Sequence, residues 1–242
     1  MKFYRTSSVD TGDFARSFLI FVLILVLSFS VVIASLLSAA NVLFRVPDFY
    51  RFEFDRTEVY NKLDMAISGT DLGSFFSDFM LHNKETFALT TEFEGIEREL
   101  FNQSEAIMMD NIRSFLDICL IWAICTLFLV IFLIFVMRFN SMAKELRLSL
   151  NIGLIIYILS VVGLFIFFYI YNGDMILKEH MMEGEFGPDD LLQKMFDGQF
   201  VFDAAIMIFV ISFIIMMVTR YIVWKLTVQK GFLSEGLKGA AK

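Results

Sequence analysis

Four long apolar runs divide the sequence, and polar segments of unequal length separate them. A run of about 20 apolar residues is long enough to cross a bilayer as a helix. The pattern therefore predicts four membrane-spanning helices, over residues 17–44, 114–137, 149–171 and 204–224. The first run is far longer than the apolar core of a signal peptide, so we interpret it as an uncleaved span.

The polar segment 45–113 has an apolar pattern of its own, which indicates folded structure. Residues 49–55 alternate in polarity, with Tyr50, Phe52 and Phe54 on one side, and this period of two predicts a buried strand face.

The rest of this segment predicts one helix and one more strand. Residues 71–81 have a helical pattern, and Thr70 is the expected N-cap. Phe87, Leu89 and Phe93 occupy alternate positions, as in a strand. We expect the two strands to pair as a small sheet on the membrane surface.

Residues 96–117 begin polar and continue without Gly or Pro into the apolar run 118–137. This predicts one helix that leaves water and enters the bilayer. Glu105, Met108 and Asn111 share a stripe of that helix, with Ile112 beside it. The stripe is either a reaction site facing one leaflet or a set of interfacial residues that mark the end of the span.

Composition sets the class of protein. Hydrophobic residues make up 57% of the 242 residues, 30 are Phe, and mean hydropathy is +0.69, all typical of an integral membrane protein. The net charge of −7 argues against nucleic acid as a partner. Cys119 and Cys125 lie six residues apart in an apolar run and fit neither a disulfide framework nor a metal site. We expect no cofactor.

Charge predicts the orientation. Segments 1–16, 138–148 and 220–242 hold 3, 3 and 5 basic residues, whereas segment 45–113 holds 7 basic and 14 acidic residues and segment 172–203 holds 2 and 8. Because Lys and Arg favour the cytoplasmic side, both termini should be cytoplasmic and both long segments outside.

The predicted fold is therefore an all-α membrane protein: four transmembrane helices with a small extracytoplasmic α+β cap. The cap is segment 45–113, and segment 172–203 is the second outer loop. The cytoplasmic parts are the N-terminus 1–16, the loop 138–148 and the tail 225–242.

Three ionisable residues stand out, two at predicted membrane edges and one in the second polar loop. Asp117 and Asp203 lie at the starts of the second and fourth spans, where a charge is costly and often functional, although headgroup solvation is the alternative. His180 lies between acidic residues and can serve as a general base, because histidine titrates near neutral pH. The alternative is a solvated surface residue.

Several motifs resemble those of the lipoprotein intramolecular transacylases, bacterial four-span membrane proteins with a large outer loop after the first span. The motifs are F-Y-R-F-E-F-D at 49–55, G-T-D-L at 69–72, R-E-L-F-N-Q-S-E-A-I-M-M-D-N-I-R at 98–113, F-G-P-D-D-L-L at 186–192 and F-V-F-D-A-A at 200–205. The resemblance covers nearly the whole chain. It implies transfer of an acyl chain from the glyceryl lipid of a lipoprotein N-terminal cysteine to that cysteine's own amino group. It also implies a bacterial cytoplasmic membrane, with membrane lipid and lipoproteins as partners.

The sequence departs from the family pattern where chemistry is expected. Family members read E-I-x-H-M-x-D-V-K at the entry to the second span. Here Glu105 and Met109 keep the pattern, but Met108 replaces the histidine, Asn111 the aspartate and Arg113 the lysine. A face of Glu, Met and Asn lacks the histidine base.

Two functions remain open from the sequence. In the first, the protein is an acyltransferase in which Glu105, His180 and Asn111 form the catalytic group. The lipid cavity would then be lined by Met108, Ile112, Asp117 and Asp203. In the second, it is a non-catalytic protein that binds lipid or lipoprotein, or regulates an active partner.

Overall fold

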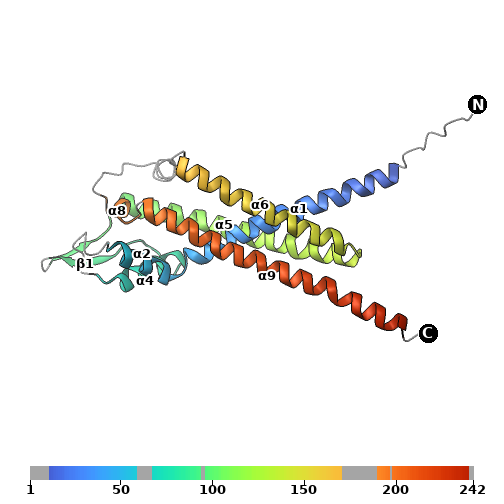
Figure 1. The fold of residues 1–242 in the computed structure, drawn as a ribbon. Helices are drawn as coiled ribbons and strands as arrows, with labels where there is room; N and C mark the ends of the chain where they lie inside the picture. Colours follow the sequence, from blue (N-terminus) through green and yellow to red (C-terminus); the bar gives the residue numbers. More distant parts are fainter. Residues whose placement is uncertain (1–10, 59–66, 94–95, 171–189, 197, 240–242) are drawn as a thin grey trace, which may run out of the picture. The chain divides into compact units, whose positions relative to one another are not determined.

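The computed structural model describes residues 11–58, 67–93, 96–170, 190–196 and 198–239. Four of its helices are long and apolar enough to cross a membrane, which confirms the predicted number of spans. They are α1 (Thr11–Leu43), α5 (Gln103–Phe139), α6 (Ala143–Ile170) and α9 (Gly198–Gly239), and Figure 1 shows them as the longest ribbons.

The chain divides into two compact units, and all four long helices contribute to both. One unit comprises Met1–Ala34, Cys125–Leu159 and Met216–Lys242. The other comprises Ser35–Ile124 and Ser160–Ile215, and it contains the short elements.

Small residues bring α1 and α6 together in the first unit. The Ser28 hydroxyl donates to the Ser149 carbonyl oxygen at 2.8 Å. A Cβ on Gly153 would lie 3.2 Å from the Ser28 carbonyl oxygen, so a glycine permits this close approach. Arg147 of α6 also donates to the Thr227 hydroxyl of α9 at 2.9 Å.

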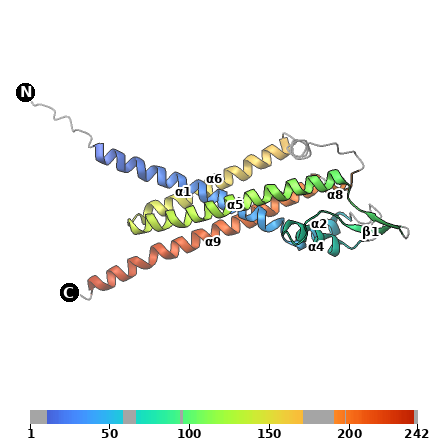
Figure 2. The same ribbon diagram turned by 180° about the vertical axis from the view of Figure 1, so that it is seen from behind.

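The second unit contains α2 (Pro47–Thr57) and α4 (Gly69–Met80), which lie side by side in both views (Figures 1 and 2). Aromatic side chains fill the space between them. The Tyr50 ring stacks on Phe76 at 5.3 Å, and Phe54 meets Phe76 edge-on at 5.5 Å. Gly73 permits the contact, since a Cβ there would lie 3.0 Å from the backbone atoms Arg51 N and Pro47 O.

The predicted strand over residues 49–55 is wrong, because this segment is the helix α2. Pro47 lies in its first turn, where the missing N–H costs nothing and the fixed φ suits a helix. Tyr50, Glu53 and Phe54 are buried, whereas Phe52 is 51% exposed. The buried positions follow the helical period of 3.6, although the polarity of residues 49–55 also fits a period of two.

The predicted helix after residue 70 is confirmed as α4, but its N-cap is Ser68 instead of Thr70. The Ser68 hydroxyl accepts a hydrogen bond from the Asp71 backbone N–H at 3.1 Å. Because the cap lies two residues earlier, Thr70 is already within the helix.

The two described strands, β1 (Thr90–Phe93) and β2 (Ile96–Glu99), form an antiparallel pair in which Thr90 lies opposite Glu99. β1 contains only the end of the second predicted strand. The helix predicted from residue 96 instead begins at Gln103 as α5, because residues 96–99 are paired in the sheet.

Candidate functional site

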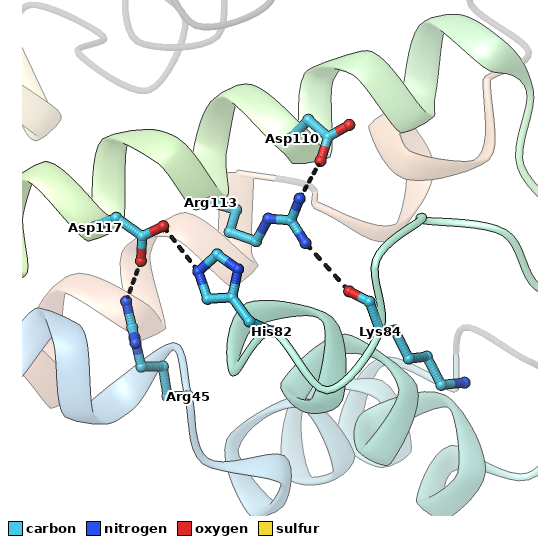
Figure 3. Close-up of polar contacts among 6 residues, drawn as sticks. All are labelled: Arg45, His82, Lys84, Asp110, Arg113 and Asp117. Carbon is cyan, nitrogen blue, oxygen red and sulfur yellow. Dashed lines mark hydrogen bonds and ion pairs between the residues drawn. The ribbon is translucent and has the colours of Figure 1, made fainter.

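Two side chains from separate segments contact Asp117 of α5 (Figure 3). The Arg45 guanidinium, just after α1, lies 2.6 Å from one carboxylate oxygen of Asp117 on α5. His82 Nε2, in the loop after α4, lies 2.8 Å from the other oxygen. We call this group the Asp117 cluster; it lies directly before the apolar run that begins at residue 118.

The backbone presents His82 in an unusual conformation. Its φ is 62°, in the left-handed region that most non-glycine residues avoid. The turn that ends α4 holds it there, since His82 N–H donates to the Phe79 carbonyl and Asn83 N–H to the Asp78 carbonyl. The imidazole is about half exposed, with 53% of the side chain accessible.

The contact with a carboxylate indicates which imidazole nitrogen of His82 carries a hydrogen. An ionised Asp117 only accepts hydrogen bonds, so Nε2 of His82 must carry the hydrogen that joins them. In a neutral imidazole the other nitrogen, Nδ1, then holds the free lone pair. Asp117 therefore orients a proton acceptor, while Arg45 balances the charge of the carboxylate.

Arg113 fixes the same loop to α5. Its guanidinium donates to Asp110 at 2.7 Å and to the Lys84 carbonyl oxygen at 3.2 Å (Figure 3). It also lies over the Phe79 ring, 4.1 Å from the centroid. Such cation–π contacts stabilise partly buried positions by about 0.5–2 kcal/mol.

Glu105 is 1% exposed and caps the start of α5. One of its carboxylate oxygens accepts from the Asn102 N–H at 2.8 Å, and the Asn102 side chain accepts from the Glu105 N–H at 2.8 Å. This reciprocal pair is a capping box. The other oxygen accepts from the N–H of Leu192, in α8 (Leu191–Met195), at 2.7 Å. Both views place α8 beside the start of α5 (Figures 1 and 2).

The other predicted members of the α5 stripe do not all point to the same buried side as Glu105. Met108 is buried in the hydrophobic cluster and Ile112 packs partly against it, but Asn111 is exposed. Six residues rotate a helix by about 600°, so Asn111 lies roughly 120° away from Glu105. The expectation that Glu105 and Asn111 point together is therefore wrong.

Asp203, in the first turns of α9, pairs with Arg56 of α2. Arg56 also lies 2.8 Å from a carboxylate oxygen of Glu53, whose side chain is fully buried. The three predicted carboxylates, Glu105, Asp117 and Asp203, thus belong to three separate polar groups: the α5 cap, the Asp117 cluster and this Arg56 group. His180 lies outside the described residues, and the described residues contain no group of three or more His, Cys, Asp or Glu placed to hold a metal ion.

The sequence analysis selected Asp117 but missed its two partners. A signal was present, because Arg45 directly follows the first apolar run and Asp117 directly precedes the second. Two opposite charges at the ends of adjacent antiparallel spans can pair. His82, a histidine in a polar loop, had no local pattern that indicated a partner.

Solved structures of the membrane integral lipoprotein intramolecular transacylase Lit from Bacillus cereus share this fold. One, with a histidine-to-arginine substitution, is 14% identical with a TM-score of 0.69, and the match covers 94% of this chain and 100% of that chain. A second is 16% identical with a TM-score of 0.65, covering 90% and 99%. A third, with a histidine-to-alanine substitution, is 15% identical with a TM-score of 0.64, covering 92% and 99%.

No protein-family model and no curated protein matches the sequence. The structural matches nevertheless extend over nearly all of both chains. The chain therefore has the multi-pass membrane fold of Lit.

Proposed function

We propose that this protein transfers an acyl chain within a lipid-anchored protein. The acyl chain leaves an ester of the diacylglyceryl group and joins the amino group of the N-terminal cysteine, which gives a lyso-form lipoprotein. The observation that carries the proposal is the match, over 94% of this chain, to a protein described as a lipoprotein intramolecular transacylase.

The distribution of polar residues supports a lipid substrate at the membrane edge. Asp117 and Asp203 each pair with an arginine close to the start of an apolar run. An ester near the headgroup layer and the amine of an anchored cysteine would both lie at this depth. The charge pattern supports an outer location for this edge, with both termini cytoplasmic.

A second candidate is a non-catalytic protein that binds lipid or lipoprotein, or regulates an active partner. Two features of α5 favour it. Met108 occupies the position that resembles the family histidine, and it is buried in the hydrophobic cluster. Both carboxylate oxygens of Glu105 accept backbone hydrogen bonds, an arrangement that favours a capping role over the role of a base.

Mass spectrometry of lipoprotein N-terminal peptides tests the two candidates. The gene is expressed in bacteria that lack every other enzyme acylating this amino group. The first candidate predicts peptides with one acyl chain on nitrogen and one on the glyceryl group. Peptides that keep both chains on the glyceryl group, together with lipoprotein that copurifies with the protein, would contradict acyl transfer and support binding.

A further inference from the structure

We propose that His82 is the general base of this acyl transfer, that Asp117 positions it, and that Arg45 holds Asp117. The assignment rests on the proposed function. It places the base in the loop after α4, and not on α5, where Met108 stands in the position of the family histidine.

The imidazole is not needed to hold its own loop. Backbone hydrogen bonds from His82 and Asn83 close the end of α4, and Arg113 binds the Lys84 carbonyl oxygen. Asp117 is also already paired by Arg45 at 2.6 Å. The loop and Asp117 therefore each have other partners, and the contact between His82 and Asp117 orients the imidazole.

A general base must present its proton-accepting nitrogen to the substrate, and the exposed side of the imidazole allows this. The side chain is half exposed, and no hydrogen bond to Nδ1 occurs within the described residues. Nδ1 is the nitrogen that keeps a lone pair when Nε2–H bonds to Asp117. Asp117 would also stabilise the imidazolium that forms, as the aspartate of a catalytic triad does.

Charged side chains of the neighbouring elements lie near His82 (Figure 3). They are Asp117, Asp110 and Arg113 of α5 and Arg45 of the segment after α1, whereas the ammonium of Lys84, in its own loop, points away over the Phe75 ring.

The reaction balances without any further reactant. Nδ1 of His82 takes a proton from the cysteine amino group as its nitrogen attacks the ester carbonyl carbon. The C–N bond forms, the bond from the carbonyl carbon to the glyceryl oxygen breaks, and that oxygen takes the proton from Nδ1. The products are an amide and a free glyceryl hydroxyl, with one proton moved from nitrogen to oxygen.

Purified full-length protein and a synthetic diacylglyceryl-cysteine peptide in detergent–lipid micelles test the assignment. General bases contribute about 10²–10⁴-fold, so His82→Gln should lower kcat by at least about 100-fold with little change in KM. Added imidazole should restore activity to His82→Ala, an effect that a merely structural role would not produce. Glu85→Gln, at an exposed position of the same loop, should keep wild-type activity and fold.

Three activity results overturn the assignment in distinguishable ways. An inactive wild type contradicts both the proposed function and the assignment of His82 as its base. An active wild type whose rate is unchanged in His82→Gln contradicts only the assignment of the base. An inactive His82→Ala that imidazole does not restore also contradicts it.

A measurement without turnover tests the same geometry. Nitrogen NMR of ¹⁵N-histidine-labelled protein should show the neutral Nε2–H tautomer for His82, identified by its loss in His82→Gln. Asp117→Asn should change the tautomer population. A neutral Nδ1–H tautomer in the wild type would overturn the assignment.

Discussion

Side chains of α2 alternate between burial and exposure with the helix period, which gives matched pairs for mutation. Phe54 is fully buried in the aromatic cluster, whereas Phe52, two residues earlier, is 51% exposed. Phe54→Ala should lower the free energy of unfolding by about 3–5 kcal/mol, because it leaves a cavity. Phe52→Ala should cost far less. Thermal unfolding in detergent compares them, and equal losses would contradict the helix assignment of this segment.

Tyr50 should make stability sensitive to alkaline pH. Burial raises the pKa of Tyr50 above its ordinary value of 10.0, while its hydroxyl donates to the Phe44 carbonyl oxygen at 2.9 Å. A raised folded-state pKa means that this contribution is complete below pH 10 and declines as pH rises further. Unfolding measured against pH should show the decline, and Tyr50→Phe should reduce it. A Tyr50→Phe protein with the same alkaline decline would assign it to other groups.

Substitutions of Gly73 and Gly163 distinguish two effects of glycine: the close approach of two helices and the lower helix propensity. A Cβ on Gly73 of α4 would lie 3.0 Å from the backbone of α2, but one on Gly163 of α6 would meet nothing within 4 Å. Gly73→Ala should therefore force α2 and α4 apart and destabilise the protein. Gly163→Ala should stabilise it slightly, since Gly within a helix costs about 0.5–1 kcal/mol relative to Ala. Melting temperatures that shift in the same direction would contradict this distinction.

Substitution of Glu105 tests how much the capping box at the start of α5 contributes to stability. Glu105→Gln replaces one acceptor oxygen with an NH₂ group, which leaves a buried backbone N–H without a partner. An unsatisfied buried group costs about 1–3 kcal/mol. Glu99→Gln, at an exposed position of β2, is the matched control and should have little effect. Chemical unfolding measures both variants, and a Glu105→Gln protein as stable as its control would exclude the cap as a source of stability.

Sequence patterns predicted the long elements better than the short ones. A run such as 118–137 has few alternatives to a membrane helix, because its backbone groups must be satisfied within the segment. Residues 49–55 are too few to distinguish a period of 2 from one of 3.6, and the packing of Phe54 on Phe76 decides between them. Local patterns do not specify such contacts between distant residues.

The contacts of the Asp117 cluster also could not be predicted from local sequence patterns. Its members are separated by up to 72 residues, from Arg45 to Asp117. Polarity at a membrane edge marked Asp117 as unusual, but a partner in a loop has no periodic signal. The contact of His82 became evident only from the three-dimensional positions of α4 and α5.

At the scale of the whole molecule, charge predicts which polar segments face outward. In a chain with Cys119 and Cys125 replaced by Ser, single cysteines at the exposed positions Ser74 and Ser141 test the orientation. A membrane-impermeant maleimide should label Ser74→Cys on intact cells. Ser141→Cys should react only after the membrane is opened. The reverse pattern would invert the predicted topology.

The hydrogen bond from Leu192 to Glu105 also dictates an order of events during biosynthesis. Its partners are 87 residues apart. A ribosome adds about 5–20 residues per second, so roughly 4–17 s pass between the synthesis of the two residues. Through this interval one oxygen of the Glu105 carboxylate has no native partner and must keep its water. The first turn of α5 can therefore lose that hydration only after most of the chain has been translated.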